Sequence, residues 1–161
     1  MTVEKLTRAE YALKLLMALW AILFPLAGLI FVIAPDTTIR AIEWAGRTLV
    51  GWQAAPVVLG NERFWLVLTA SMMATITGLA VLSYRALARG AVREYQGAVQ
   101  VLLLSKAVST LGFLFCLAAL APSPIYCAGA FVDGSILCIT WGIYHRAMLS
   151  RTSAKGVPCS V

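Results

Sequence analysis

Four long runs of apolar residues constrain this chain more than any other feature of its sequence. They cover about residues 11–33, 64–84, 96–121 and 125–144. A helix needs roughly 20 residues to cross the hydrocarbon core of a bilayer, and each run reaches that length. Because unpaired backbone polar groups are costly in lipid, all four runs are predicted to be helices. The runs lack the alternation of polar and apolar residues that a membrane β-barrel requires.

The composition indicates the same fold class. Hydrophobic residues make up 61% of the chain and charged residues 12%, whereas soluble domains have about 45–50% apolar and about 25% charged residues. Too few polar side chains remain to cover a soluble protein of 161 residues. We therefore predict an all-α integral membrane protein, a four-transmembrane-helix bundle. It forms a single membrane domain over residues 1–151, followed by a short, poorly ordered polar tail at 152–161.

The connection between the first two runs is long enough to hold a further helix, predicted over about residues 37–50. Asp36 or Thr37 is expected to cap its N-terminus. Apolar and charged positions separate onto different faces, with Glu43 and Arg47 four residues apart. The apolar face carries Ile39, Ile42, Leu49 and Val50, and the charged face carries Arg40, Glu43 and Arg47. We expect an external amphipathic helix that lies at the membrane interface, followed by a loop over residues 51–61.

The distribution of Lys and Arg predicts the orientation. With four spans, nine basic residues fall on the side of the two termini and three on the opposite side. The positive-inside rule then places both termini in the cytoplasm of a multi-pass cell-membrane protein, most simply in a bacterial inner membrane. The net charge of +6 comes from residues that flank the apolar runs. It therefore indicates attraction to lipid headgroups, and we expect no nucleic-acid partner.

Small residues recur at helical spacing on three of the predicted spans. Such stripes allow the backbones of neighbouring helices to approach closely in a bilayer. We predict helix-packing roles for Ala70, Ala74 and Gly78, for Ser105, Ser109 and Gly112, and for Ala130 and Gly134.

Lys106 and Asp133 are charged residues that lie far from the ends of the apolar runs, and we treat them as a candidate polar intramembrane site. Lys106 is 17 residues before Ser123 and Asp133 is 10 residues after it. The difference of 7 residues corresponds to roughly 10 Å of depth. A direct ion pair would then need tilted helices, a bulge or a bridging water. Without it, we expect an Asp133 that is either protonated or hydrogen-bonded to hydroxyl groups, and a Lys106 that extends toward the cytoplasm. The hydroxyl candidates are Thr75, Thr77, Ser109 and Thr110.

The sequence carries no recognisable catalytic pattern. There is no HExxH, GxSxG or P-loop motif, and the four cysteines include no CxxC pair. We expect no metal, no cofactor and no enzymatic activity. The leading hypothesis is a non-catalytic accessory, assembly or scaffold subunit, with other membrane proteins or further copies of itself as partners. The alternative is an oligomeric small transporter or lipophilic-ligand binder that uses Lys106 and Asp133.

Overall fold

The computed structural model describes residues 6–52, 62–119 and 123–155. Within these ranges the chain is all-helical and forms five helices, α1 (Arg8–Ile33), α2 (Pro35–Val50), α3 (Glu62–Arg89), α4 (Val92–Ala119) and α5 (Pro124–Lys155). Among the described residues, four helices (α1, α3, α4 and α5) are long and apolar enough to cross a membrane. The prediction of an all-α chain with four helices of membrane-spanning length is thus confirmed.

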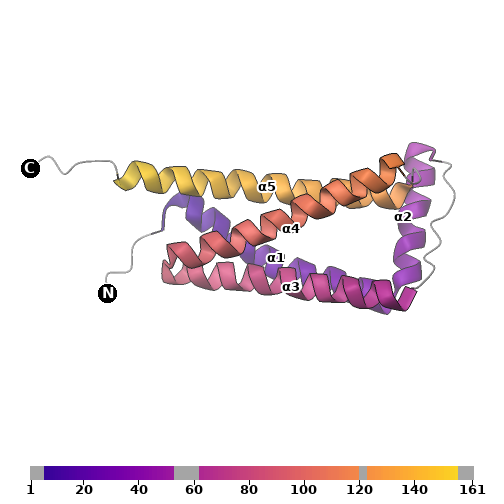
Figure 1. Cartoon of the computed structure of the whole chain (residues 1–161), viewed down its shortest axis with the longest axis horizontal. Helices are drawn as coiled ribbons and strands as arrows, with labels where there is room; N and C mark the ends of the chain where they lie inside the picture. The colour runs from indigo at the N-terminus through magenta and orange to yellow at the C-terminus, as the bar shows by residue number, and fades with distance from the viewer. Residues whose placement is uncertain (1–5, 53–61, 120–122, 156–161) are drawn as a thin grey trace, which may run out of the picture.

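The four long helices run alternately in opposite directions (Figure 1). Helix α1 packs against α3 and α5, and α4 packs against the same two helices. The start of α1 and the end of α5 lie at one end of the molecule, together with the α3–α4 turn. At the opposite end, α2 lies across the long helices and contacts α1 and α5.

The faces where the long helices meet are apolar. Leu13, Met17, Leu87 and Leu102 are fully buried there. Large apolar side chains also cover the outside, and Phe131 is 75% exposed. A water-soluble monomer rarely exposes apolar patches of more than a few hundred Å². The exposed surface of the long helices is therefore consistent with a multi-pass membrane protein.

The α3–α4 connection is a short glycine-centred turn. Gly90 has a φ of 69°, which favours glycine because a Cβ atom is disfavoured in the left-handed region. Its N–H donates to the Leu87 carbonyl, and the Ala91 N–H donates to the Ala86 carbonyl at 2.9 Å. These bonds satisfy carbonyl groups at the end of α3 and reverse the chain tightly.

Helix α2 confirms the predicted amphipathic helix but begins differently. It starts at Pro35, after an Ala34 cap position with no side-chain hydrogen bond, so the predicted cap at Asp36 or Thr37 is wrong. Proline is favoured at this first position because it has no N–H to satisfy and its φ is already helical. The predicted i,i+4 pair is present, with Arg47 Nη2 3.9 Å from Glu43 Oε2.

Two predicted non-helical segments are only partly described. Helix α5 continues to Lys155, so the start of the predicted tail is helical. Residues 156–161 lie outside the described part of the chain. In the predicted loop after α2, Gly51 closes the helix in the left-handed conformation, and residues 53–61 lie outside the described residues.

Gly46 permits the closest contact between α2 and α5. A Cβ atom built on Gly46 would lie 2.5 Å from the Pro124 Cβ, a distance that side chains do not tolerate. The proline ring is rigid and cannot turn away. By contrast, no atom of a neighbouring residue lies within 4 Å of a Cβ built on Gly78.

We therefore predict that Gly46→Ala destabilises the docking of α2 by about 1–3 kcal/mol, the usual cost of overpacking. Gly78→Ala is the matched control, since both substitutions gain helix propensity and only one creates a clash. The measurement is hydrogen exchange of the α2 amides in detergent. Equal protection of α2 in the two variants would contradict the contact.

Candidate functional site: buried polar clusters

A buried ion pair joins two of the long apolar helices, α4 and α5. Lys106 on α4 is 3% exposed and Asp133 on α5 is 9% exposed, and Lys106 Nζ lies 2.7 Å from Asp133 Oδ1. The Ser109 hydroxyl donates to the other carboxylate oxygen, Oδ2. Both oxygens of Asp133 are therefore engaged by α4. We call Lys106, Ser109 and Asp133 the mid-helix cluster.

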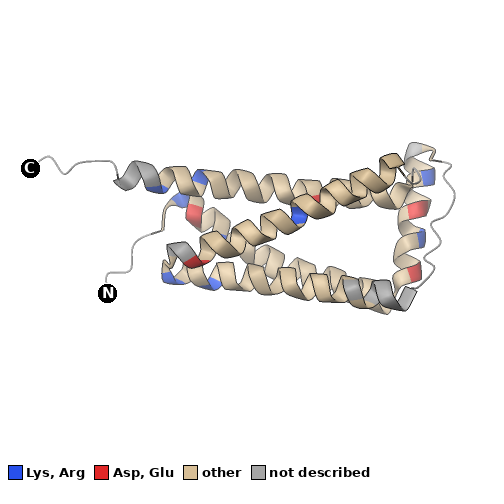
Figure 2. Ribbon diagram, in the orientation of Figure 1, with Lys and Arg blue, Asp and Glu red and all other residues tan. Residues whose placement is uncertain are grey.

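The expectation of a 10 Å offset between Lys106 and Asp133 is wrong, and with it the premise of an unpaired Asp133. The estimate assumed that α4 and α5 are parallel to a common axis. In the structure α4 crosses α5 obliquely, and Figure 2 shows charged positions midway along the long helices where these two cross. Measured from the helix ends, Lys106 is 13 residues before Ala119 and Asp133 is 9 residues after Pro124. The remaining difference of four residues, roughly 6 Å, is spanned by the long lysine side chain.

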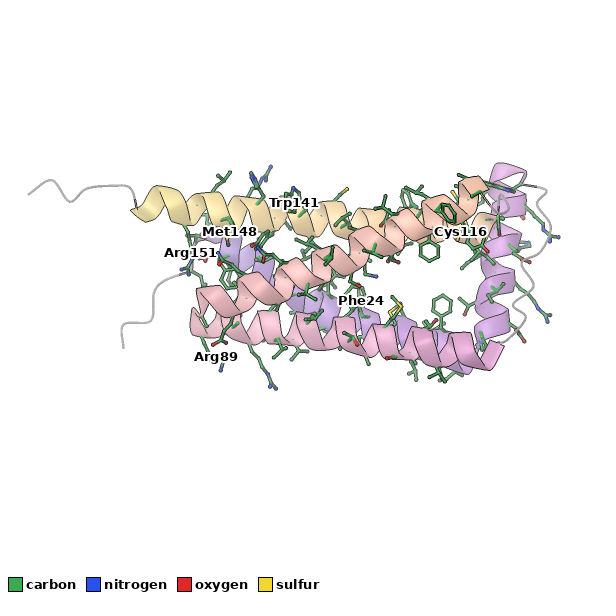
Figure 3. The ribbon with its side chains drawn as sticks, in the orientation of Figure 1. Phe24, Arg89, Cys116, Trp141, Met148 and Arg151 are labelled. Atoms are coloured by element: carbon green, nitrogen blue, oxygen red, sulfur yellow. The ribbon has the colours of Figure 1, made fainter. Side chains whose placement is uncertain are left out.

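Helix α1 also contributes to the environment of Lys106. The ammonium group lies 5.1 Å from the centre of the Phe24 ring, within the range of a cation–π contact. Phe24 is itself buried and stacks on Trp20, one turn earlier. Figure 3 labels Phe24 between the long helices. Three helices therefore meet at the lysine.

The hydroxyl groups expected near Asp133 divide into two kinds. Ser109 donates to the carboxylate, as the hydrogen-bonding alternative proposed. The Thr75, Thr77 and Thr110 hydroxyls instead donate to backbone carbonyls one turn earlier on their own helices. Such local bonds satisfy a hydroxyl in apolar surroundings without a partner helix.

A second polar cluster lies at the end of the molecule where α1 begins. Glu10 on α1 is fully buried and accepts hydrogen bonds from Arg151 on α5 and from the Tyr95 hydroxyl on α4, the latter at 3.0 Å. The same carboxylate accepts from the Thr7 backbone N–H, and Thr7 caps α1 in return. We call Thr7, Glu10, Tyr95 and Arg151 the terminal cluster. Figure 3 labels Arg151 at this end.

The terminal cluster was not predicted from the sequence. A signal for Glu10 was present, because Thr7 and Glu10 have the spacing of a capping box. Nothing local to Tyr95 or Arg151 indicates that they converge on Glu10. Between the two clusters, Trp20 Nε1 donates to Thr140 Oγ1 at 3.1 Å and joins α1 to α5 once more.

The predicted helix-packing residues are partly placed at helix contacts. Gly134 faces Thr110 on α4, whose Cγ2 would lie 3.5 Å from a Cβ at that position. Ser105, Ser109, Ala70 and Ala130 are half-buried, whereas Ala74, Gly78 and Gly112 are exposed. Other glycines lie closest to side chains of neighbouring helices. These are Gly28 beside Met73, Gly46 beside Pro124 and Gly129 beside Phe113.

A groove of about 490 Å³ lies on the outer side of the contact between α4 and α5. Its lining is mainly apolar, and neither Lys106 nor Asp133 belongs to it. The residues that line it are Gln100, Leu103, Leu104 and Ala107 on α4, and Leu137, Cys138 and Trp141 on α5.

The described residues show no arrangement that would bind a metal. No group of three or more His, Cys, Asp and Glu side chains lies together in this part of the chain. Every buried side-chain nitrogen and oxygen atom in it has a hydrogen-bond partner. Chemically, the two clusters can therefore hold helices together or pass a proton between partners.

Comparison with family models, with curated proteins and with solved structures finds no match to this chain.

Removing one partner of a buried ion pair leaves the other charge uncompensated. We therefore predict that Asp133→Asn destabilises the protein by about 3–5 kcal/mol, and that adding Lys106→Met restores most of this loss. The measurement is thermal unfolding of both variants in detergent. A single variant as stable as the unsubstituted protein would show that the pair carries no net charge interaction.

We also predict that Tyr95→Phe costs about 1.5–3 kcal/mol, the usual value of a hydrogen bond to a charged group. Tyr11→Phe is the control, because Tyr11 lies on α1 close to Glu10 in sequence and is 55% exposed. Chemical denaturation in detergent compares the two. Equal midpoints for the two variants would contradict the role given to the Tyr95 hydroxyl.

Proposed function

We propose that this chain is an integral membrane protein, a four-helix transmembrane bundle with both termini in the cytoplasm. We further propose that it serves as a non-catalytic accessory, assembly or scaffold subunit of a membrane complex. In this placement α2 lies at the outer interface, and the terminal cluster lies on the cytoplasmic side. The nine-to-three distribution of Lys and Arg supports the orientation. A bacterial inner membrane is the simplest location.

One observation carries the proposed role. Every buried polar side-chain atom in the described segments is already partnered within the chain, and both clusters join α1, α4 and α5. A substrate site would instead present polar groups to a cavity. The interior is thus used to hold the helices in place, and the outer faces remain for contact with other subunits or with further copies of the chain.

The alternative is an oligomeric small transporter or a lipophilic-ligand binder. The burial of Lys106 and Asp133 favours it, because charged residues within membrane spans commonly mark transport pathways. Proton exchange between the two side chains would be the simplest use of the pair. Four spans enclose little space for a polar substrate, so this alternative requires several copies.

We predict that the chain, solubilised in mild detergent, is retained in a stoichiometric complex. The measurement is native mass spectrometry of a tagged chain expressed at its natural level. A defined partner protein supports the subunit role, whereas a homo-oligomer agrees with both hypotheses. In either case the complex should persist in the Asp133→Asn/Lys106→Met double variant. A monomer with no associated subunit would contradict the subunit role. If the unsubstituted chain carries a proton-coupled flux across vesicle membranes and the double variant does not, that loss would favour the transporter.

The orientation has a separate test. In a variant without native cysteines, Thr48→Cys on α2 should react with a membrane-impermeant maleimide added outside intact cells. Ala88→Cys, near the end of α3, should react only after the membrane is opened. Both positions are exposed in the structure. The reverse labelling pattern would invert the topology.

A further inference from the structure

The groove between α4 and α5 has the dimensions of a binding site for a hydrocarbon chain. Its volume of about 490 Å³ lies within the usual range for ligand pockets, roughly 300–1,000 Å³. Leu103, Leu104, Ala107 and Leu137 provide apolar walls. The groove is open along its outer side, and Figure 3 shows Trp141 on α5, at the level where α4 lies beside it.

One end of the groove is polar. Gln100 lies there and donates to the Tyr144 hydroxyl at 3.2 Å. One turn beyond Trp141, the His145 ring stacks on the indole, with ring centres 6.2 Å apart. His145 is exposed, and so is Arg146, the next residue of α5. The groove therefore runs from a polar end at Gln100 to an apolar end at Ala107 and Leu137. His145 and Arg146 lie on α5 beyond the polar end, outside the lining of the groove.

We propose that this groove binds one anionic phospholipid. An acyl chain would lie along Leu104, Cys138 and Leu137, and the headgroup phosphate would lie near His145 and Arg146. The charge complementarity at one end and the apolar lining of the rest select a molecule with an anionic headgroup and a hydrocarbon tail. Lys and Arg residues near the cytoplasmic surface of a membrane attract anionic headgroups.

This inference rests on the membrane placement proposed above but not on the role as a subunit. With the termini in the cytoplasm, His145 and Arg146 lie at the depth of the inner headgroups. Trp141 then lies just below them, where its indole suits the boundary between headgroups and acyl chains. The groove ends near the middle of the bilayer, at the level of the mid-helix cluster.

The test uses native mass spectrometry of the detergent-solubilised full chain with added dioleoyl phosphatidylglycerol or dioleoyl phosphatidylcholine. We expect one retained phosphatidylglycerol per chain, at least about tenfold preferred over phosphatidylcholine. Trp141→Ala should lower the retained fraction about tenfold. Phe131→Ala is the matched control, because it removes another exposed aromatic ring of α5 outside the groove and should leave retention unchanged. His145→Ala with Arg146→Ala should remove the preference for the anionic lipid.

A second variant covers the case in which Trp141→Ala fails to fold. Ala107→Phe fills the groove from the α4 side, and it should displace the lipid while retaining the helices. Equal retention of the two lipids, equal loss in Trp141→Ala and Phe131→Ala, or no retained lipid would overturn the proposal. A transmembrane helix of another protein that occupies the groove in place of lipid would also overturn the proposal. Alkaline carbonate extraction of the membranes from which the chain is purified distinguishes failure of the lipid proposal from failure of the membrane placement. Release of the chain by carbonate would refute the membrane placement itself.

Discussion

A charged side chain in apolar surroundings must be paired, and this requirement constrains how α4 and α5 meet. Lys106 and Asp133 are both buried midway along α4 and α5, and the apolar Phe24 ring lies beside the lysine. The ammonium group and the carboxylate can remain there because they contact each other and because Ser109 occupies the second carboxylate oxygen. The oblique crossing of α4 and α5 brings the two side chains within reach of each other. The ion pair is one of several contacts between these helices, with the close approach of Gly129 to Phe113 among the others.

The polar contacts form three layers along the molecule, and all three include α1 and α5. The terminal cluster holds the first layer, Trp20 and Thr140 the second, and the mid-helix cluster with Phe24 the third. Helix α3 takes part in none of these three layers. It contacts α1 through the close approach of Gly28 to Met73 and through Lys14, which lies over the Tyr84 ring. Where the outside of a protein is as apolar as its inside, hydrophobicity alone does not select which helix faces meet. Specific hydrogen bonds and close backbone contacts make that selection.

The sequence predicts the helices well because their length and apolar character are local properties. The four runs and the amphipathic segment all became helices, with ends shifted by several residues. The contacts between helices were predicted poorly. The spacing of Ala70, Ala74 and Gly78 identifies a stripe, but a stripe does not reveal its neighbour, and two of the three residues are exposed. The pairing of Lys106 with Asp133 depends on a crossing angle, which residue counting does not provide. Glu10 could be recognised as part of a cap, whereas its bonds to Tyr95 and Arg151 arise from packing over a large sequence separation.

The bond between Arg151 and Glu10 has a consequence for the way the protein is made. These residues are 141 positions apart, so they are synthesised far apart in time. At a synthesis rate of roughly 5–20 residues per second, the arginine follows the glutamate by roughly 7–28 seconds. Until Arg151 has been added, α1 lacks this hydrogen-bond partner on α5, and the four-helix arrangement remains open between α1 and α5. A nascent chain that stalls before Arg151 therefore has only Thr7 and Tyr95 of the terminal cluster as hydrogen-bond partners for the Glu10 carboxylate.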